Sequence, residues 1–158
     1  MDVNTEIDIF ISKAFSLVNE DKNKEAFEIV NAISSDKYVN NLNKDHFQAI
    51  GDIYLSLGQF ELAKDFYLKA ENPEAASLAL IVLDNLDEAS KLLLKCPKSP
   101  PSTWCNFLID VFNEKAIKQW PSFLEIRHFM ELTVYSLLLG KRHYFISLLL
   151  KRLNRLEG

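Results

Sequence analysis

The sequence predicts an all-helical protein in which antiparallel helical hairpins stack on one another. Apolar residues recur at i, i+3, i+4 and i+7 along most of the 158 residues, which is the spacing of an amphipathic helix. Glycine and proline, which interrupt helices, number only 4 and 5. Several apolar stripes follow each other so closely that the helices carrying them must fold back antiparallel.

Local signals divide this pattern into about nine helices within a single domain, 1–158. The first helix is expected to begin at Glu6, because Thr5 and Asp8 have the spacing of a capping box. The polar run 34–43 reads as a loop. The expected helices cover residues 6–18, 25–33, 44–57, 60–70, 73–83, 86–95, 103–118, 122–139 and 142–156.

Helix boundaries in the middle of the chain have recognisable residues. Gly58 ends the third helix, because glycine adopts the left-handed conformation after a helix without steric cost. Asn72 and Pro73 open the fifth helix as a cap followed by proline at the first helical position. Asn85 and Glu88 resemble a capping box for the sixth helix.

Residues 96–101 contain three prolines and form the clearest internal boundary. This segment is short enough to be a corner between two sub-blocks, a repeat stack at 1–96 and C-terminal helices at 102–158. Ser102 is expected to cap the helix that follows the corner, and Gly140 to end the eighth helix.

Residues 44–70 combine small and aromatic residues in a defined order. The positions concerned are Phe47, Ile50, Gly51, Tyr54, Gly58, Phe60, Ala63, Tyr67 and Ala70. Gly51 and Ala63 are small enough for two helices to approach closely, while the aromatic residues fill the space around them. This segment resembles a tetratricopeptide repeat, whose pattern has the same residue types at these positions.

The resemblance extends more weakly over residues 7–96. Ala26 upstream and Ala89 downstream take the place of Ala63, at spacings of 37 and 26 residues, whereas the family's repeat has about 34 residues. Lys13 stands where the family has leucine. The resemblance therefore implies a short α-solenoid that is compact and distorted rather than a regular superhelix.

Proteins of this family bind other proteins in a groove lined by the first helix of each repeat. Carried over by position, the resemblance implies partner contacts at Asp8, Ile11, Phe15, Asp45, Gln48, Asp52 and Leu55. An acidic and apolar groove favours a basic or amphipathic segment. Family members that hold an acidic tail have Lys and Asn where Gln48 and Asp52 stand here, so that ligand is not expected. The alternative is that the polar residues form a solvated face.

Three interpretations of function remain open: an adaptor, scaffold or assembly subunit; a small secretion chaperone for one client; and a nucleic-acid-binding regulator. The last would use the basic C-terminal hairpin, but the chain is acidic overall, with a pI of about 5.4. Nucleic acid is therefore not the expected partner. Residues 122–156 are richer in apolar side chains than one buried stripe requires, so they are either buried on both sides or bind a partner or a second copy.

No residue pattern indicates catalysis, a cofactor or a metal, and we expect a cytoplasmic protein that is not an enzyme. The four glycines are isolated, which excludes a phosphate-binding loop. Cys96 and Cys105 lack metal-site spacing and read as free thiols. His46 is expected in solvent, and His128 would need ligands beyond Glu125 and Glu131. The apolar stretch near the C-terminus is interrupted at residues 140–143, before it reaches the length of a membrane span.

Overall fold

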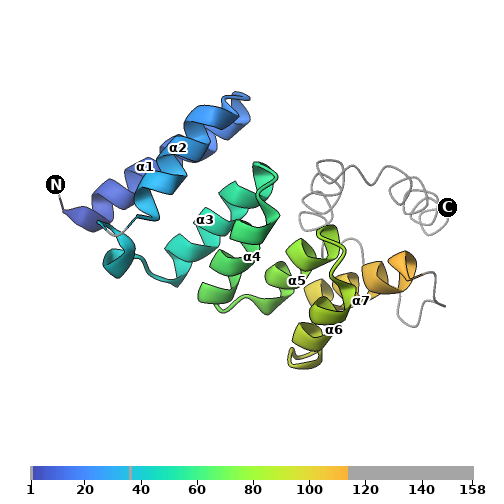
Figure 1. The fold of residues 1–158 in the computed structure, drawn as a ribbon. Helices are drawn as coiled ribbons and strands as arrows, with labels where there is room; N and C mark the ends of the chain where they lie inside the picture. Colours follow the sequence, from blue (N-terminus) through green and yellow to red (C-terminus); the bar gives the residue numbers. More distant parts are fainter. Residues whose placement is uncertain (1, 36, 114–158) are drawn as a thin grey trace. The chain divides into compact units, whose positions relative to one another are not determined.

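The computed structural model describes residues 2–35 and 37–113, which form seven α-helices and one 3-10 helix and contain no strand (Figure 1). The predicted all-helical class is confirmed. The expected count of nine helices is not reached, because helices 122–139 and 142–156 fall outside the described residues. The helices are α1 (Val3–Asn19), α2 (Asn23–Ile33), η1 (Val39–Asn41), α3 (Lys44–Ser56), α4 (Phe60–Lys69), α5 (Pro73–Val82), α6 (Leu86–Leu94) and α7 (Pro100–Phe112).

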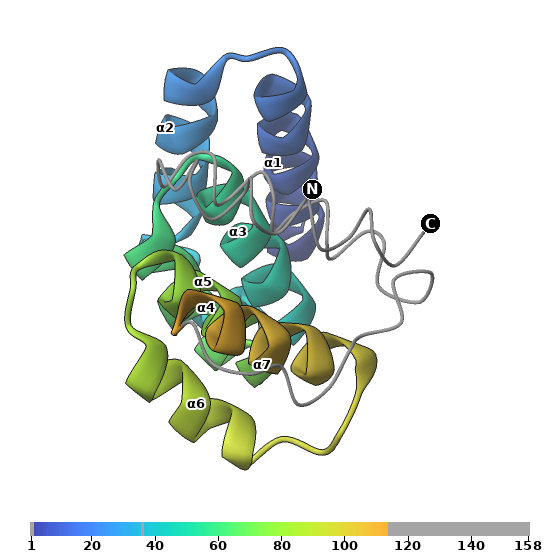
Figure 2. The same cartoon turned by 90° about the vertical axis from the view of Figure 1, so that its right-hand side faces the viewer.

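The chain divides into two compact units, residues 1–72 and 73–158. In the first unit α1 pairs with α2 and α3 pairs with α4, and α3 also packs against both helices of the first hairpin (Figure 2). In the second unit α5, α6 and α7 pack against one another. The proline segment 96–101 therefore lies inside the second unit. The expectation of a single domain stays a prediction.

The same three-residue turn ends four of the helices. Its middle residue has a positive φ of 60° at Asp21, 75° at Gly58, 56° at Glu71 and 65° at Asp84. In each turn the next residue donates its N–H to the carbonyl five residues earlier, over 2.8–2.9 Å. This pattern satisfies carbonyl groups that the helix end leaves without partners. The prediction that Gly58 ends a helix is confirmed, and the three other turns form without glycine.

Three helices begin earlier than predicted, and for two of them, α1 and α7, the reason is that an upstream cap is used. The α1 helix begins at Val3 rather than Glu6, since the Asp2 carboxylate accepts the Thr5 N–H at 2.7 Å. The α7 helix begins at Pro100 rather than Thr103, since Ser99 forms a capping box with Ser102. Proline is tolerated in a first helical turn because the N–H it lacks has no partner inside the helix.

Other boundaries differ in detail. The α2 helix begins at Asn23, two residues before the predicted start, and α7 ends at Phe112 rather than near residue 118. Asn85 precedes α6 as predicted, but the capping box is absent, because its amide donates to the Glu88 carboxylate at 2.6 Å instead. The predicted loop at 34–43 contains η1.

The core of the second hairpin depends on Gly51. A Cβ atom at this position would lie 2.8 Å from two ring carbons of Tyr67, closer than packed atoms approach. Gly51, Ala63 and Tyr67 are all buried. The predicted close approach at Gly51 is therefore present, and the Tyr67 ring occupies the space that the missing side chain leaves.

Candidate functional site

The first helices of the two hairpins, α1 and α3, are joined by a histidine–carboxylate contact. The Nδ1 atom of His46 accepts the backbone N–H of Asn43, so the neutral ring carries its proton on Nε2. That N–H donates to Asp8 Oδ1 at 2.9 Å. His46 is only 7% exposed, so its predicted place in solvent is wrong. Its ring takes part in the capping box at the start of α3, and this position holds the ring against α1 rather than in solvent.

The predicted partner-binding residues fall into three groups by exposure. Asp8 and Asp45 are exposed, and the Asp8 side chain keeps 69% of its area in solvent. Phe15 is half-buried on α1. Ile11 and Leu55 lie in the core, at 8% and 1% exposure. A partner at this face would therefore meet carboxylates and an aromatic edge, and the two aliphatic residues would support the helices from beneath.

Gln48 and Asp52, the remaining predicted residues, belong to a hydrogen-bonded network on α3. Asp52 Oδ1 accepts the Tyr67 hydroxyl at 2.7 Å and the Gln48 amide at 3.3 Å. Gln48 Oε1 in turn accepts the Asn72 amide at 2.8 Å. Both side chains are half-buried. The network links α3 to α4 and to the end of the first unit, so these two side chains have fixed orientations.

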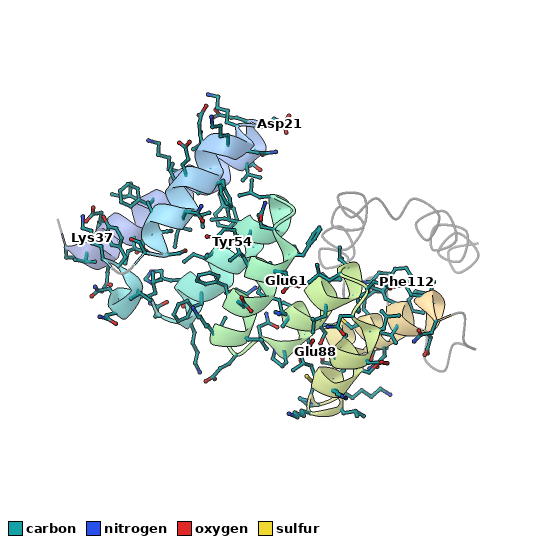
Figure 3. The ribbon with its side chains drawn as sticks, in the orientation of Figure 1. Asp21, Lys37, Tyr54, Glu61, Glu88 and Phe112 are labelled. Atoms are coloured by element: carbon teal, nitrogen blue, oxygen red, sulfur yellow. The ribbon has the colours of Figure 1, made fainter. Side chains whose placement is uncertain are left out.

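Burial and the neighbouring carboxylate keep the Tyr67 hydroxyl protonated. Removal from water raises the pKa of Tyr67 above its ordinary value, and the negative charge of Asp52 and their hydrogen bond raise it further. Burial also raises the pKa of Tyr54, the residue labelled on α3 in Figure 3, whose hydroxyl donates to Asn31 Oδ1 at 2.6 Å. Both phenols therefore act as donors at neutral pH and hold adjacent helices together.

The first hairpin also has a pocket that the sequence did not predict. Its volume is about 220 Å³, and its lining comes from α1, α2 and the connection before α3: Phe10, Glu28, Ile29, Ala32 and Tyr38. The one available signal was Tyr38 itself, an aromatic residue inside a polar run. Tyr38 is 6% exposed, which is unusual for a residue in a segment that reads as a solvated loop.

The described part of the chain contains neither a metal-binding cluster nor a helix that could span a membrane. Within residues 2–35 and 37–113, no three His, Cys, Asp or Glu side chains are grouped to hold a metal ion. No helix among these residues has the length and apolarity that crossing a membrane requires. His128, with Glu125 and Glu131 near it in the sequence, and the basic C-terminal hairpin lie outside these residues. Cys96 and Cys105 are free thiols, and burial raises the pKa of both.

Comparison with known proteins supports the central repeat. Residues 47–72 match the family model of the tetratricopeptide repeat. This match confirms the resemblance predicted for residues 44–70. No curated protein and no solved structure gives a significant match to the chain.

Proposed function

We propose, from the tetratricopeptide-type repeat at residues 47–72, that this chain is a protein-interaction module that serves as an adaptor, scaffold or assembly subunit. The family match is the single observation that carries this proposal, because stacked helical hairpins of this kind form extended binding surfaces. The partner segment lies along the face shared by α1 and α3. We assign the module to the cytoplasm, where its two free thiols would stay reduced.

Charge and shape at this face favour a basic or amphipathic partner segment. Asp8 and Asp45 offer exposed carboxylates, and Phe15 offers a half-buried aromatic ring about two helical turns after Asp8 on α1. Positive side chains of the partner would complement the carboxylates, which increases the rate of association and selects the partner. A half-buried aromatic side chain is the type of residue that contributes most of the binding free energy in many interfaces.

The network on α3 supports the same face by fixing its polar side chains before binding. Gln48 and Asp52 are already held by Asn72 and Tyr67, so contact with a partner would immobilise few additional rotamers. Lower loss of side-chain entropy strengthens binding without any new contact. In this proposal the role of Asp52 and Gln48 is to present fixed acceptors, while Ile11 and Leu55 hold the helices in place.

The proposal is tested by identifying a partner and then disrupting the face. The full chain is immobilised, proteins retained from a lysate are identified by mass spectrometry, and the Kd of the purified partner is measured. We expect Phe15→Ala to weaken binding by about tenfold or more. Phe27→Ala is the matched control, because Phe27 is also half-buried but lies on α2, where its ring contacts Tyr54.

A charge test separates electrostatic from apolar contributions. The double variant Asp8→Asn/Asp45→Asn should weaken binding by about three- to tenfold, with a smaller effect at high salt. The control Glu61→Gln/Asp65→Asn removes two exposed carboxylates from α4. If Phe15→Ala and the Asp8/Asp45 variant, both with unchanged helical circular dichroism, bind the partner as tightly as the unmodified chain, the assigned face is wrong.

A further inference from the structure

We propose that the pocket on the first hairpin is a second docking site, which takes one apolar side chain of a partner protein that carries Lys or Arg beside it. The pocket lies among Phe10 of α1, three residues of α2 and Tyr38 of the connection that follows. None of the seven residues assigned to the α1–α3 face lines it. The inference therefore goes beyond the proposed function and can fail independently of it.

The pocket opens on the side of α2 that faces away from α3. Phe27 and Asn31 define the α3-facing side, because they contact Tyr54. At 100° of rotation per residue, Ile29 lies about 160° from both of these residues, on the opposite side of the helix, and Glu28 and Ala32 lie on its flank. On α1, Phe10 lines the same pocket. The outer face of the hairpin thus has an apolar hollow that no described helix covers.

The volume and lining suit a single side chain. A cavity of about 150 Å³ lined by apolar residues is large enough to bind benzene. The present pocket, at about 220 Å³, is of the size that a Leu, Met or Phe side chain requires. It is smaller than the roughly 300–1,000 Å³ of sites that bind whole small-molecule ligands. Phe10, Ile29 and Ala32 supply the apolar walls.

The pocket wall formed by Tyr38 is fixed. The Tyr38 hydroxyl donates to Glu6 Oε1 at 2.8 Å, and its ring meets that of Phe10 edge-on, with centroids 6.2 Å apart. The Lys37 ammonium lies 4.8 Å from the centroid of the same ring. Because these contacts hold the wall before anything binds, an incoming side chain would not have to order it.

Glu28 gives the pocket its charge preference. Its carboxylate is exposed at the lining, and among the described residues it has no hydrogen bond or ion pair. Nearby charges are already engaged, since Glu6 accepts from Tyr38 and Lys37 lies on the Tyr38 ring. A carboxylate without a partner beside an apolar hollow complements an apolar group that has a cation next to it. This charge complementarity selects the occupant.

The test uses three small probes with one apolar tail: 4-phenylbutylammonium, 4-phenylbutanol and 4-phenylbutyrate. Each is titrated into the full ¹⁵N-labelled chain, and Kd values are read from the amide shifts of Ile29, Ala32 and Tyr38. We expect the ammonium to bind about three- to tenfold more tightly than the alcohol, and the carboxylate to bind most weakly. Glu28→Gln should remove the advantage of the ammonium and leave the affinity of the alcohol unchanged.

Two variants make the outcome decisive. Glu25→Gln removes a carboxylate one turn earlier on α2, outside the lining, and should leave the preference for the ammonium intact. Ala32→Phe should fill the hollow and abolish the shifts from all three probes. Shifts absent with every probe, equal affinity for ammonium and carboxylate, or equal effects of Glu25→Gln and Glu28→Gln would each overturn the proposal. So would a dimer that Ala32→Phe converts to monomer, because the occupant would then be a second copy.

Discussion

In the α3–α4 hairpin Gly51 lies against the ring of Tyr67, whereas Ala14 and Val30 stand at the equivalent positions of the α1–α2 hairpin, 37 residues earlier. Both positions of the first hairpin are fully buried. In both hairpins the residue on the first helix is the smaller of the two, but the difference in size is larger in the glycine–tyrosine pair. The total volume of the pair changes less between the hairpins than the volume at either position alone. Cores tolerate such exchanges when their volume is conserved. The family model matches the glycine–tyrosine hairpin and does not extend to the alanine–valine one.

The turns show the same contrast. Gly58 closes the second hairpin with φ of 75°, and Asp21 closes the first with φ of 60°. Figure 3 places Asp21 at the tip of the first hairpin and Lys37 at its opposite end. The backbone hydrogen bonds are equivalent, so the geometry of the turn does not depend on glycine. The two hairpins therefore have the same turn geometry. Only in the second hairpin does a glycine make that turn recognisable from the sequence.

The largest effect is expected from Gly51→Ala, because the added methyl group would overlap the Tyr67 ring. Overpacking of this kind should lower the free energy of unfolding by about 1–3 kcal/mol. Chemical denaturation followed by circular dichroism measures it. Combining Gly51→Ala with Tyr67→Val recreates the pair found in the first hairpin, so the double variant should lose less than the sum of the two single losses. Additive losses would show that the two positions do not compensate each other.

A smaller effect is expected from Tyr67→Phe, which keeps the ring and removes the hydroxyl that donates to Asp52 over 2.7 Å. Loss of a hydrogen bond to a buried charged acceptor lowers the free energy of unfolding by about 1.5–3 kcal/mol. We expect a smaller loss of about 1 kcal/mol for this variant, because Asp52 is only half-buried. The first hairpin has valine at this place and provides no such contact. An unchanged denaturation midpoint would mean that solvent replaces the hydroxyl without loss.

The smallest effect is expected at the turns. Gly58→Asp should destabilise the chain by about 0.5–1 kcal/mol, because a side chain is then forced into the left-handed region. Asp21→Gly should be neutral or stabilising by about 0.3 kcal/mol, since relief of strain is offset by the greater freedom of the unfolded chain. Thermal and chemical denaturation measure both variants. A clear loss of stability from Asp21→Gly would indicate that the Asp21 side chain contributes to the turn.

The sequence predicted the helices better than it predicted where they begin. Apolar periodicity is averaged over many residues, so the helical class and the pairing at Gly58 could be predicted. A helix start depends on which of two nearby caps is used, and at both Asp2 and Ser99 the upstream one is used. The upstream cap adds helical turns and the hydrogen bonds that come with them. The spacing of residues around Thr5 and Ser102 does not indicate which of the two nearby caps is used.

The candidate sites were predicted less completely than the fold. The resemblance to the repeat family, carried over by position, selected Asp8 and Asp45, which are exposed, but it also selected Leu55, which lies in the core. One-dimensional spacing cannot distinguish a groove-facing residue from one that faces the next helix. The pocket could not be predicted for a similar reason, because it needs Tyr38 from an irregular connection to meet Phe10.

The three-residue turns have a consequence for the order of folding. The turns at Asp21, Gly58 and Asp84 each bring two helices of one unit together with a loop so short that little chain entropy is lost on closure. Chains dominated by such near-neighbour contacts fold quickly, within about microseconds to milliseconds. Residues 34–43 are the longest connection between α1 and α7. The α1–α2 and α3–α4 pairs are therefore expected to form first, and their association across that connection should limit the rate at which residues 1–72 reach the native state.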